Sequence, residues 1–311
     1  SPQAKSYEYF ALDLEKGTQR SVSVQSFRRR NLEVLSDSEE VEFEASDGTL
    51  LHGVLVRPKG VTEPGPLIVE VHGGPAHHTS WEFSRFRHFL VNRGYTLMSV
   101  NFRGSTGFGR AFQQKGFRQF GRSMQQDLVD TANWAIEKGY ADKDAIAVAG
   151  GSYGGYASAM AALQNPDVFK TAIIEHAMLD VRYQSQFPPP SWGLGKELWT
   201  RYFGDLENEA DAKLMDQFSP ITLASDLKVP VLIVAGKADR VVGFEQSERF
   251  VKKAREAGAD VEVLFFDEEG HGLRRWQSNV KHARVVEEFL AKHLGGRSGG
   301  WDWSEIAADY F

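Results

Sequence analysis

The stretch Gly150-Gly151-Ser152-Tyr153-Gly154-Gly155 lies between an apolar run at residues 145–149 and a helix-forming run at residues 156–163. This order predicts a β-strand, a sharp turn and an α-helix, with Ser152 in the turn. In a G-x-S-x-G turn, glycines permit the strained backbone that lifts the serine hydroxyl clear of the sheet, and the new helix points its N–H groups at the reacting atoms. We therefore predict that Ser152 is a nucleophile.

The rest of the chain supplies the strands and helices that such a turn requires. From residue 41 onward, β-branched runs alternate with helical runs, which is typical of a mostly parallel sheet with helices on both faces. The predicted strands are residues 41–45, 51–57, 67–72, 96–101, 145–149, 171–175, 231–235 and 261–266. Eight strands are the number in an α/β-hydrolase sheet, so we predict an α/β fold of that class. Ser123 and Gln126 form a capping-box pattern, which predicts a helix start there.

A serine hydroxyl needs a base that accepts its proton and an acid that orients the base. In this fold the three residues follow one another in the order Ser, Asp or Glu, His. Asp239 follows the predicted strand at residues 231–235, and His271 follows the strand at residues 261–266. Because parallel strands end at one rim of the sheet, where open α/β folds place their active sites, we predict that Asp239 and His271 complete a catalytic triad.

Each assignment has an alternative. Asp239 could simply hold a turn, with Asp180 as the rival acid, and His271 could be an ordinary loop residue. Of the rival histidines, His282 is expected to face solvent or pack within the last helix, and His176 to be a core histidine with satisfied hydrogen bonds. The agreement of chain order, strand ends and turn chemistry favours Asp239 and His271.

Catalysis of acyl transfer also requires N–H groups that stabilise a tetrahedral oxyanion. Gly73 and Gly74 follow the predicted strand at residues 67–72, so their N–H groups can approach such an oxygen. The N–H of Tyr153, next to the nucleophile, is the other expected donor. Loss of one such donor typically costs about 3 kcal/mol of transition-state stabilisation.

Composition argues against several other classes of protein. A net charge of -6 and a pI near 5.9 do not suit a nucleic-acid surface, which needs a local excess of Lys and Arg. No apolar run approaches the ~20 residues that span a bilayer, so we expect no membrane segment. We expect a soluble protein, in the cytoplasm unless a signal peptide has been removed.

Motifs for cofactors are also missing from the sequence. There is no cysteine, which removes thiolate metal sites and cysteine nucleophiles. No dinucleotide-binding or P-loop motif occurs, and the adjacent His77 and His78 lack the H-E-x-x-H context of a zinc site. We therefore predict a reaction that uses neither a metal nor another cofactor.

Several motifs occur together in this chain: Val71-His-Gly-Gly-Pro75, Arg93-Gly-Tyr95, Asn101-Phe-Arg-Gly-Ser-Thr-Gly-Phe-Gly109, Asp127-Leu-Val-Asp130, Gly150-Gly-Ser-Tyr-Gly-Gly-Tyr156, Asp239-Arg-Val-Val242 and Gly270-His-Gly272. In this combination, over roughly residues 35 to 295, the chain resembles the peptidase domain of the prolyl oligopeptidase family, and most of all its acylaminoacyl-peptidase-like branch. The resemblance implies a serine peptidase that acts on small peptides or acyl esters.

The resemblance also implies roles for individual residues. Ser152, Asp239 and His271 would form the triad, and Tyr153 with Gly74, or Gly73, would supply the oxyanion N–H groups. In the prolyl-specific branch a tyrosine precedes the two glycines and lends its hydroxyl to the oxyanion. His72 occupies that place here, as in the acylaminoacyl-peptidase branch, which argues against strict cleavage after proline.

Two segments lie outside the predicted catalytic domain at residues 37–295. Residues 1–36 form an N-terminal extension whose expected hairpin, residues 7–24, resembles the last strands of the β-propeller that family members usually carry. A chain of 311 residues cannot also hold a full propeller, so we expect either an excised domain or a compact relative with an open cleft. Residues 296–311 form a glycine-rich linker and an aromatic tail, expected to dock on its own body or on a second subunit of a homo-oligomer.

Specificity is expected to come from the segment at residues 180–202. Its aromatic residues Tyr183, Trp192, Trp199 and Tyr202 predict a substrate pocket, although they could equally pack the inserted helices onto the core. Arg103 is a candidate for binding a substrate carboxylate or, alternatively, for a structural salt bridge.

We therefore predict a serine hydrolase that forms an acyl-enzyme and cleaves peptide or acyl-aminoacyl bonds. A carboxylesterase with the same triad is the nearest alternative. A non-catalytic interaction domain that keeps the fold is the alternative from another class of protein.

Overall fold

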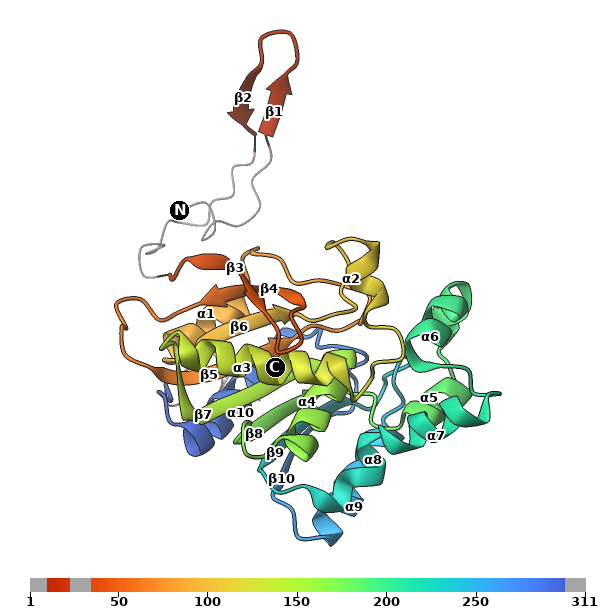
Figure 1. Ribbon diagram of the computed structural model, residues 1–311. Helices are drawn as coiled ribbons and strands as arrows, with labels where there is room; N and C mark the ends of the chain where they lie inside the picture. The colour runs from red at the N-terminus through yellow and green to blue at the C-terminus, as the bar shows by residue number, and fades with distance from the viewer. Residues whose placement is uncertain (1–9, 23–34, 300–311) are drawn as a thin grey trace.

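The computed structural model describes residues 10–22 and 35–299 of the chain. At its centre is an eight-stranded sheet with the strand order β10-β9-β8-β7-β5-β6-β4-β3 (Figure 1). The strands are β3 (Ser38–Glu44), β4 (Leu50–Val56), β5 (Gly65–Val71), β6 (Thr96–Asn101), β7 (Ala141–Gly151), β8 (Thr171–Glu175), β9 (Val231–Gly236) and β10 (Val261–Phe266). The predicted α/β fold with eight strands is confirmed.

Most of the sheet is parallel. The strands from β5 to β10 pair in parallel, whereas β3 pairs with β4, and β4 with β6, in antiparallel fashion at one edge. From β5 the chain proceeds to β6 on one side and then to β7 on the other. Open α/β folds bind their ligands at such a switch point, outside the carboxyl ends of the strands. The loops that follow β5 and β7 therefore lie where folds of this class bind their ligands.

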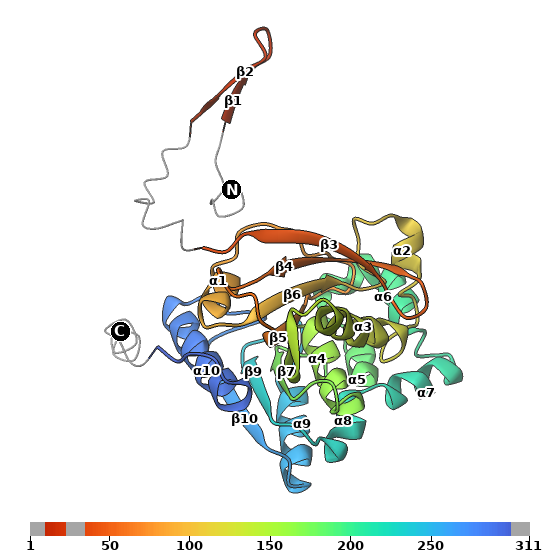
Figure 2. The ribbon, with the colours of Figure 1, turned by 60° about the vertical axis from the view of Figure 1, so that its left-hand side comes forward.

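Helices cover both faces of the sheet. On one face lie α1 (Arg85–Asn92) and α10 (Trp276–Leu294), and on the other lie α3 (Ser123–Glu137), α4 (Tyr153–Gln164) and α9 (Glu245–Glu256) (Figure 2). Each face has its own core of buried apolar side chains. The core on the α10 side includes Phe289 and Leu290. Across the described part of the chain, no helix has the length and apolar character needed to span a membrane.

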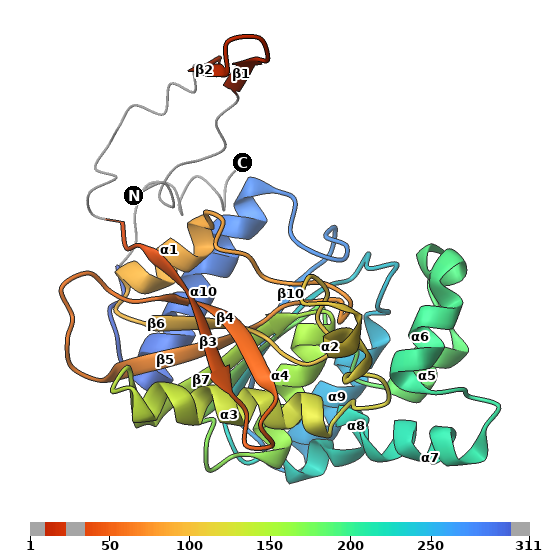
Figure 3. The same cartoon turned by 45° about the horizontal axis from the view of Figure 1, so that its top comes forward.

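The connection between β8 and β9 is a helical insertion. Its elements are α5 (Val181–Gln186), the 3-10 helix η3 (Pro190–Gly195), α6 (Lys196–Phe203), α7 (Glu209–Gln217), α8 (Pro220–Leu223) and the 3-10 helix η4 (Ala224–Asp226). In Figure 3 the green and cyan helices α5, α6 and α7 lie to one side of the sheet. A short helix, α2 (Arg110–Gln114), follows β6.

Both ends of the chain carry additional structure. The predicted leading hairpin is present as β1 (Phe10–Asp13) and β2 (Thr18–Ser21), which pair antiparallel in a sheet of their own. At the other end, the glycine-rich linker packs on the body, because the Tyr95 hydroxyl donates to the Gly295 carbonyl (2.5 Å) and the Gly299 N–H donates to Glu287 (2.7 Å). The aromatic tail at residues 301–311 lies outside the described residues, so its docking stays a prediction.

The predicted element boundaries are close to those observed. The strands at residues 96–101, 171–175 and 261–266 have the expected bounds, and β7 is longer than expected at both ends. The capping-box prediction was wrong, because Arg122 is the N-cap of α3 and no side chain caps that helix. Ser123 is instead its first helical residue.

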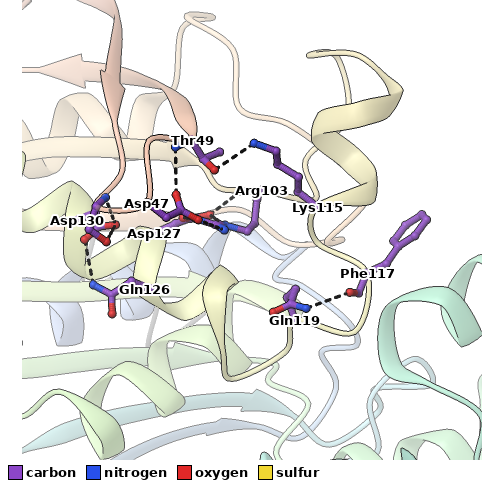
Figure 4. Close-up of polar contacts among 10 residues, drawn as sticks. Asp47, Thr49, Arg103, Lys115, Phe117, Gln119, Gln126, Asp127 and Asp130 are labelled. Carbon is purple, nitrogen blue, oxygen red and sulfur yellow. Dashed lines mark hydrogen bonds and ion pairs between the residues drawn. The ribbon is translucent and has the colours of Figure 1, made fainter.

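Arg103, just after β6, is the centre of a buried polar network (Figure 4). Its Nη2 donates to Asp127 of α3 (2.7 Å), as does its backbone N–H (2.7 Å), and its Nη1 donates to Asp47 in the β3–β4 turn (2.7 Å). Asp130 of the same helix accepts the N–H and the hydroxyl of Ser46 in that turn, both at 2.9 Å. The network thus holds the antiparallel edge of the sheet against α3.

Replacement of Asp127 by Ala is expected to destabilise the fold by about 3 kcal/mol or more, because it leaves the buried Arg103 charge without its main partner. The Asp127 side chain has 0% exposure, whereas that of Asp47 has 51%. Asp47→Ala is therefore the matched control and should cost about 1 kcal/mol or less. Urea unfolding measures both, and equal midpoints for the two variants would contradict this account.

Candidate active site

The turn between β7 and α4 has the geometry of a nucleophile elbow. Ser152 has φ 59° and ψ -119°, so its backbone is in the left-handed region that non-glycine residues rarely adopt. The flanking glycines are needed for close contact, because a Cβ on Gly154 would lie 2.0 Å, and one on Gly150 2.5 Å, from the Val71 carbonyl oxygen. The strain therefore falls on Ser152 itself, and the glycines let the turn press against the end of β5.

Hydrogen bonds hold this turn in place. The Ser152 N–H donates to the carbonyl of Glu175, the last residue of β8 (2.9 Å), and the Ser152 carbonyl accepts the N–H of Tyr156 (3.0 Å). Tyr153 is the first residue of α4, and the first N–H groups of a helix have no partner within it. The Tyr153 N–H is therefore available to a developing oxyanion.

Asp239 and His271 lie together, as predicted. The His271 Nδ1 contacts the Asp239 Oδ2 at 2.8 Å. Asp239 Oδ1 accepts the N–H groups of Val241 (2.8 Å) and Val242 (3.0 Å). Burial opposes the charge on Asp239, but His271 and these N–H groups hold the pKa of its carboxyl below the usual range. Asp239 therefore stays ionised and orients the imidazole through its Nδ1.

Glu269 anchors the loop that carries His271. Its side chain, 3% exposed, accepts the N–H groups of Arg274 and Arg275, both at 3.0 Å. Its carbonyl accepts the N–H of Ala238 (3.0 Å), next to Asp239. The two loops that carry the acid and the base are thus tied directly to each other. Glu269 is absent from the residues predicted from sequence, although its place two residues before His271 was a usable signal.

The glycine loop after β5 lies against the serine turn. A Cβ on Gly73 would lie 3.5 Å from the Ser152 Cβ and 3.2 Å from the Gly151 carbonyl oxygen. Gly74 has φ +125°, and a Cβ there would lie 2.8 Å from the Ala76 nitrogen. The structure therefore brings Gly73 to the side of the candidate nucleophile, and it requires glycine at the adjacent Gly74.

His72 stiffens this loop. Its Nδ1–H donates to the Gly73 carbonyl (2.7 Å), its Nε2 accepts the Ser105 hydroxyl (2.8 Å), and its ring stacks on Phe102 with centroids 4.5 Å apart. Burial lowers the pKa of His72 to about 4, against the opposing effect of the Gly73 hydrogen bond. The ring is therefore neutral near pH 7.

Two of the residues predicted for a substrate pocket are internal, which corrects that prediction. Tyr202 is 0% exposed, and its hydroxyl donates to the Gly104 carbonyl (2.6 Å). The Arg103 guanidinium is 7% exposed and is bound by Asp127 and Asp47, so the alternative of a structural salt bridge describes it. Neither side chain is open to a substrate, because tertiary hydrogen bonds already use its polar atoms.

The other three predicted pocket residues remain partly exposed. Trp192 of η3 and Trp199 of α6 stack with ring centroids 4.0 Å apart, and Phe203 packs beside both. The Tyr183 hydroxyl donates to Glu245 Oε1 (2.7 Å), with the Arg249 guanidinium over its ring. The aromatic segment therefore contains one stacked cluster and one separate tyrosine.

The rival residues have other partners. Asp180 caps α5 by accepting the Tyr183 N–H (2.9 Å), and it binds Arg249 (2.8 Å). The His282 side chain is 9% exposed and pairs with Glu175 at 2.7 Å, so it packs rather than faces solvent. The expectation that the hydrogen bonds of His176 are satisfied was wrong, because its buried Nδ1 has no partner.

Acid should destabilise the protein through His72. Below its ordinary pKa of 6.5 the unfolded state binds a proton that the folded state excludes until about pH 4, so stability falls as the pH falls through this window. Between pH 7 and pH 4 the free energy of unfolding of the wild type should therefore fall by up to about 3 kcal/mol more than that of His72→Gln. Urea unfolding of both proteins at both pH values measures the difference, and parallel pH profiles would refute the assignment.

Comparisons with known proteins agree with this geometry. Residues 81–297 match the prolyl oligopeptidase family. Dipeptidyl aminopeptidase BIII of Pseudoxanthomonas mexicana is 35% identical over 266 residues, which are 83% of this chain and 39% of that protein. Acylamino-acid-releasing enzyme 1 of Oryza sativa subsp. japonica is 29% identical over 236 residues, which are 74% of this chain and 30% of that protein.

Solved structures give the same result. Puromycin hydrolase superposes with a TM-score of 0.88 at 26% identity, over 96% of this chain and 45% of its own. The acylaminoacyl peptidase of Pyrococcus horikoshii superposes with a TM-score of 0.82 at 25% identity, over 97% of this chain and 49% of its own. This chain thus spans less than half the length of each of these four proteins. From the sequence match, the fold and the serine turn together, we conclude that the chain belongs to the prolyl oligopeptidase family.

Proposed function

We propose that this protein is a serine peptidase that cleaves an amide bond of a short peptide or an acyl-aminoacyl compound through an acyl-enzyme. Ser152 is the nucleophile, His271 is the general base, and Asp239 is the carboxylate that orients His271. The observation that carries the proposal is the 2.8 Å contact between His271 and Asp239, on loops at the same rim as the strained Ser152 turn. Family membership supports the reaction class.

In the first half of the reaction, the Ser152 Oγ attacks the scissile carbonyl carbon while His271 Nε2 accepts the hydroxyl proton. The charge of Asp239 stabilises the imidazolium that forms. The N–H of Tyr153 and that of Gly74, or Gly73, stabilise the negative oxygen of the tetrahedral intermediate. His271 then gives its proton to the amine nitrogen, the C–N bond breaks, and the acyl group remains as an ester on Ser152.

In the second half, a water molecule attacks the ester carbon and His271 accepts a proton from that water. The second tetrahedral intermediate uses the same N–H groups. When it collapses, the Ser152 oxygen leaves, takes the proton from His271, and the acid product is released. The cycle consumes one water molecule and restores every residue.

The substrate class follows from relatives and remains part of the proposal. Proteins that this chain resembles are named as dipeptidyl aminopeptidase, acylamino-acid-releasing enzyme and puromycin hydrolase. These names refer to a dipeptide, an acylamino acid and puromycin, which are all small groups or molecules, and on that ground we favour short substrates here. Tyr183, Trp192 and Trp199 keep partly exposed rings and are the candidates for binding the acyl side.

A fluorophosphonate should label the wild-type protein once, and Ser152→Ala should give no adduct by intact-mass spectrometry. Hydrolysis by Ser152→Ala should fall at least about 10⁴-fold, because the nucleophile and base act as a unit. The hydrolysis rate of Asp239→Asn should fall by a similar factor with an unchanged fold, because His271 loses the charge that orients it. No adduct on the folded wild type would favour a non-catalytic interaction domain.

The ratio of two rates distinguishes a peptidase from a carboxylesterase, which would use the same triad. We expect the wild type to cleave a blocked aminoacyl anilide, as well as an acyl ester of the same size, with a measurable kcat/KM for both. The alcohol of an ester can leave without first being protonated, whereas the amine of an amide needs a proton from His271 before it leaves. Cleavage of the ester alone would make the carboxylesterase the better description.

A further inference from the structure

A second histidine–carboxylate pair lies beside the catalytic residues. The His282 Nε2 is 2.7 Å from the Glu175 Oε1, and the two side chains are 9% and 24% exposed. Burial opposes the charge on Glu175, but His282 and His176 hold its pKa below the usual range. Glu175 is therefore an ionised, largely buried carboxylate for which the proposed reaction has no role.

This pair connects the two halves of the active site. The Glu175 carbonyl accepts the N–H of Ser152, and a Cβ on Gly155 would lie 2.6 Å from that oxygen, so the serine turn is pressed against Glu175. His282 belongs to α10, which begins at Trp276, shortly after His271. One side-chain contact thus joins the residue that holds the nucleophile turn to the helix that follows the histidine loop.

The neighbour of Glu175 shows what the pair has to hold. His176 has φ 45°, a strained backbone for a non-glycine residue, and it is 8% exposed. Its unpartnered Nδ1 lies 3.9 Å from Asp239 Oδ2, and its ring centroid lies 6.0 Å from that of His271. Strained residues persist only where the surrounding structure determines them. The anchored Glu175 side chain is part of that surrounding structure.

We propose that Glu175 and His282 are positioning residues, whose hydrogen bond fixes the spacing between the Ser152 turn and the Asp239–His271 pair. The inference rests on the proposed function of Ser152 as the nucleophile. Neither residue touches the reacting atoms. Their effect passes through the Glu175 backbone to Ser152 on one side and through α10 to the His271 loop on the other.

A merely structural role would have a different signature. The loss of a partly buried hydrogen bond with no effect on alignment lowers the melting temperature and leaves the rate per active site unchanged. Loss of alignment lowers kcat and the fluorophosphonate labelling rate, with KM little changed, because a displacement on the order of 1 Å between reacting groups costs up to about 100-fold in rate.

The test compares two substitutions of His282. His282→Phe keeps the ring, which in wild type packs on Phe86 at 5.1 Å, but removes the donor to Glu175. His282→Gln keeps a donor. We expect the kcat of His282→Phe and its labelling rate to fall about 10-fold, when both rates are divided by the number of sites that label at completion. His282→Gln should recover most of the lost kcat and labelling rate.

A matched control is available at the other edge of the sheet. The His52 Nδ1 lies 3.0 Å from Glu42, and the His52 ring stacks on Phe108, so this pair joins the same residue types, with a carboxylate that is 64% exposed. It joins β4 to β3, and β7, β5 and β6 separate β4 from β8. His52→Phe should leave kcat and the labelling rate at wild-type values, whatever it does to the melting temperature.

The outcomes separate the two proposals. If wild type labels at Ser152 but His282→Phe labels and turns over like His52→Phe, the positioning role is refuted and the triad stands. If His282→Phe does not fold, Glu175→Met removes the acceptor of the same hydrogen bond at a similar side-chain length and should also slow labelling. A folded wild type that takes no label would refute the nucleophile, and the positioning role with it.

Discussion

The whole site depends on one close contact, that of the serine turn with the end of β5. A Cβ on Gly154 would lie 2.0 Å from the Val71 carbonyl oxygen, so only glycine allows β7 to end and α4 to begin at this distance. The same contact brings the Gly73 and Gly74 loop beside Ser152. Any side chain at Gly154 would push the turn away from the sheet and separate Ser152 from the Gly73 loop.

The sheet topology converts this contact into an active site. Strands β7, β8, β9 and β10 are neighbours in that order, so Ser152, Glu175, Asp239 and His271 lie at or after their carboxyl ends along one rim. Hydrogen bonds then tie the loops pairwise: Ser152 to Glu175, Ala238 to Glu269, and Asp239 to His271. Each catalytic loop is thereby fixed by its neighbour, which limits the freedom that would otherwise have to be lost in the transition state.

Electrostatics near the site follow from burial and pairing. Burial keeps the His72 ring neutral near neutral pH, because it lowers the pKa of His72 to about 4. Asp239 and Glu175 keep their charges in spite of burial, because each carboxylate has an imidazole partner. The two pairs meet around His176, whose strained backbone and unpartnered Nδ1 set this site apart from a simple triad.

Local sequence determined the strands and the serine turn, because β-branched runs and glycine spacing are properties of neighbouring residues. Chain order and strand ends also predicted the candidate triad Ser152, Asp239 and His271 and the candidate oxyanion glycines. Local sequence left Arg103 and Tyr202 open between a substrate contact and a structural role, because their buried partners Asp127 and Gly104 belong to other segments, and it assigned no partner to His176 or His282. Only the tertiary structure decided these roles, because burial and pairing across distant strands and helices are set by the packing of the whole chain.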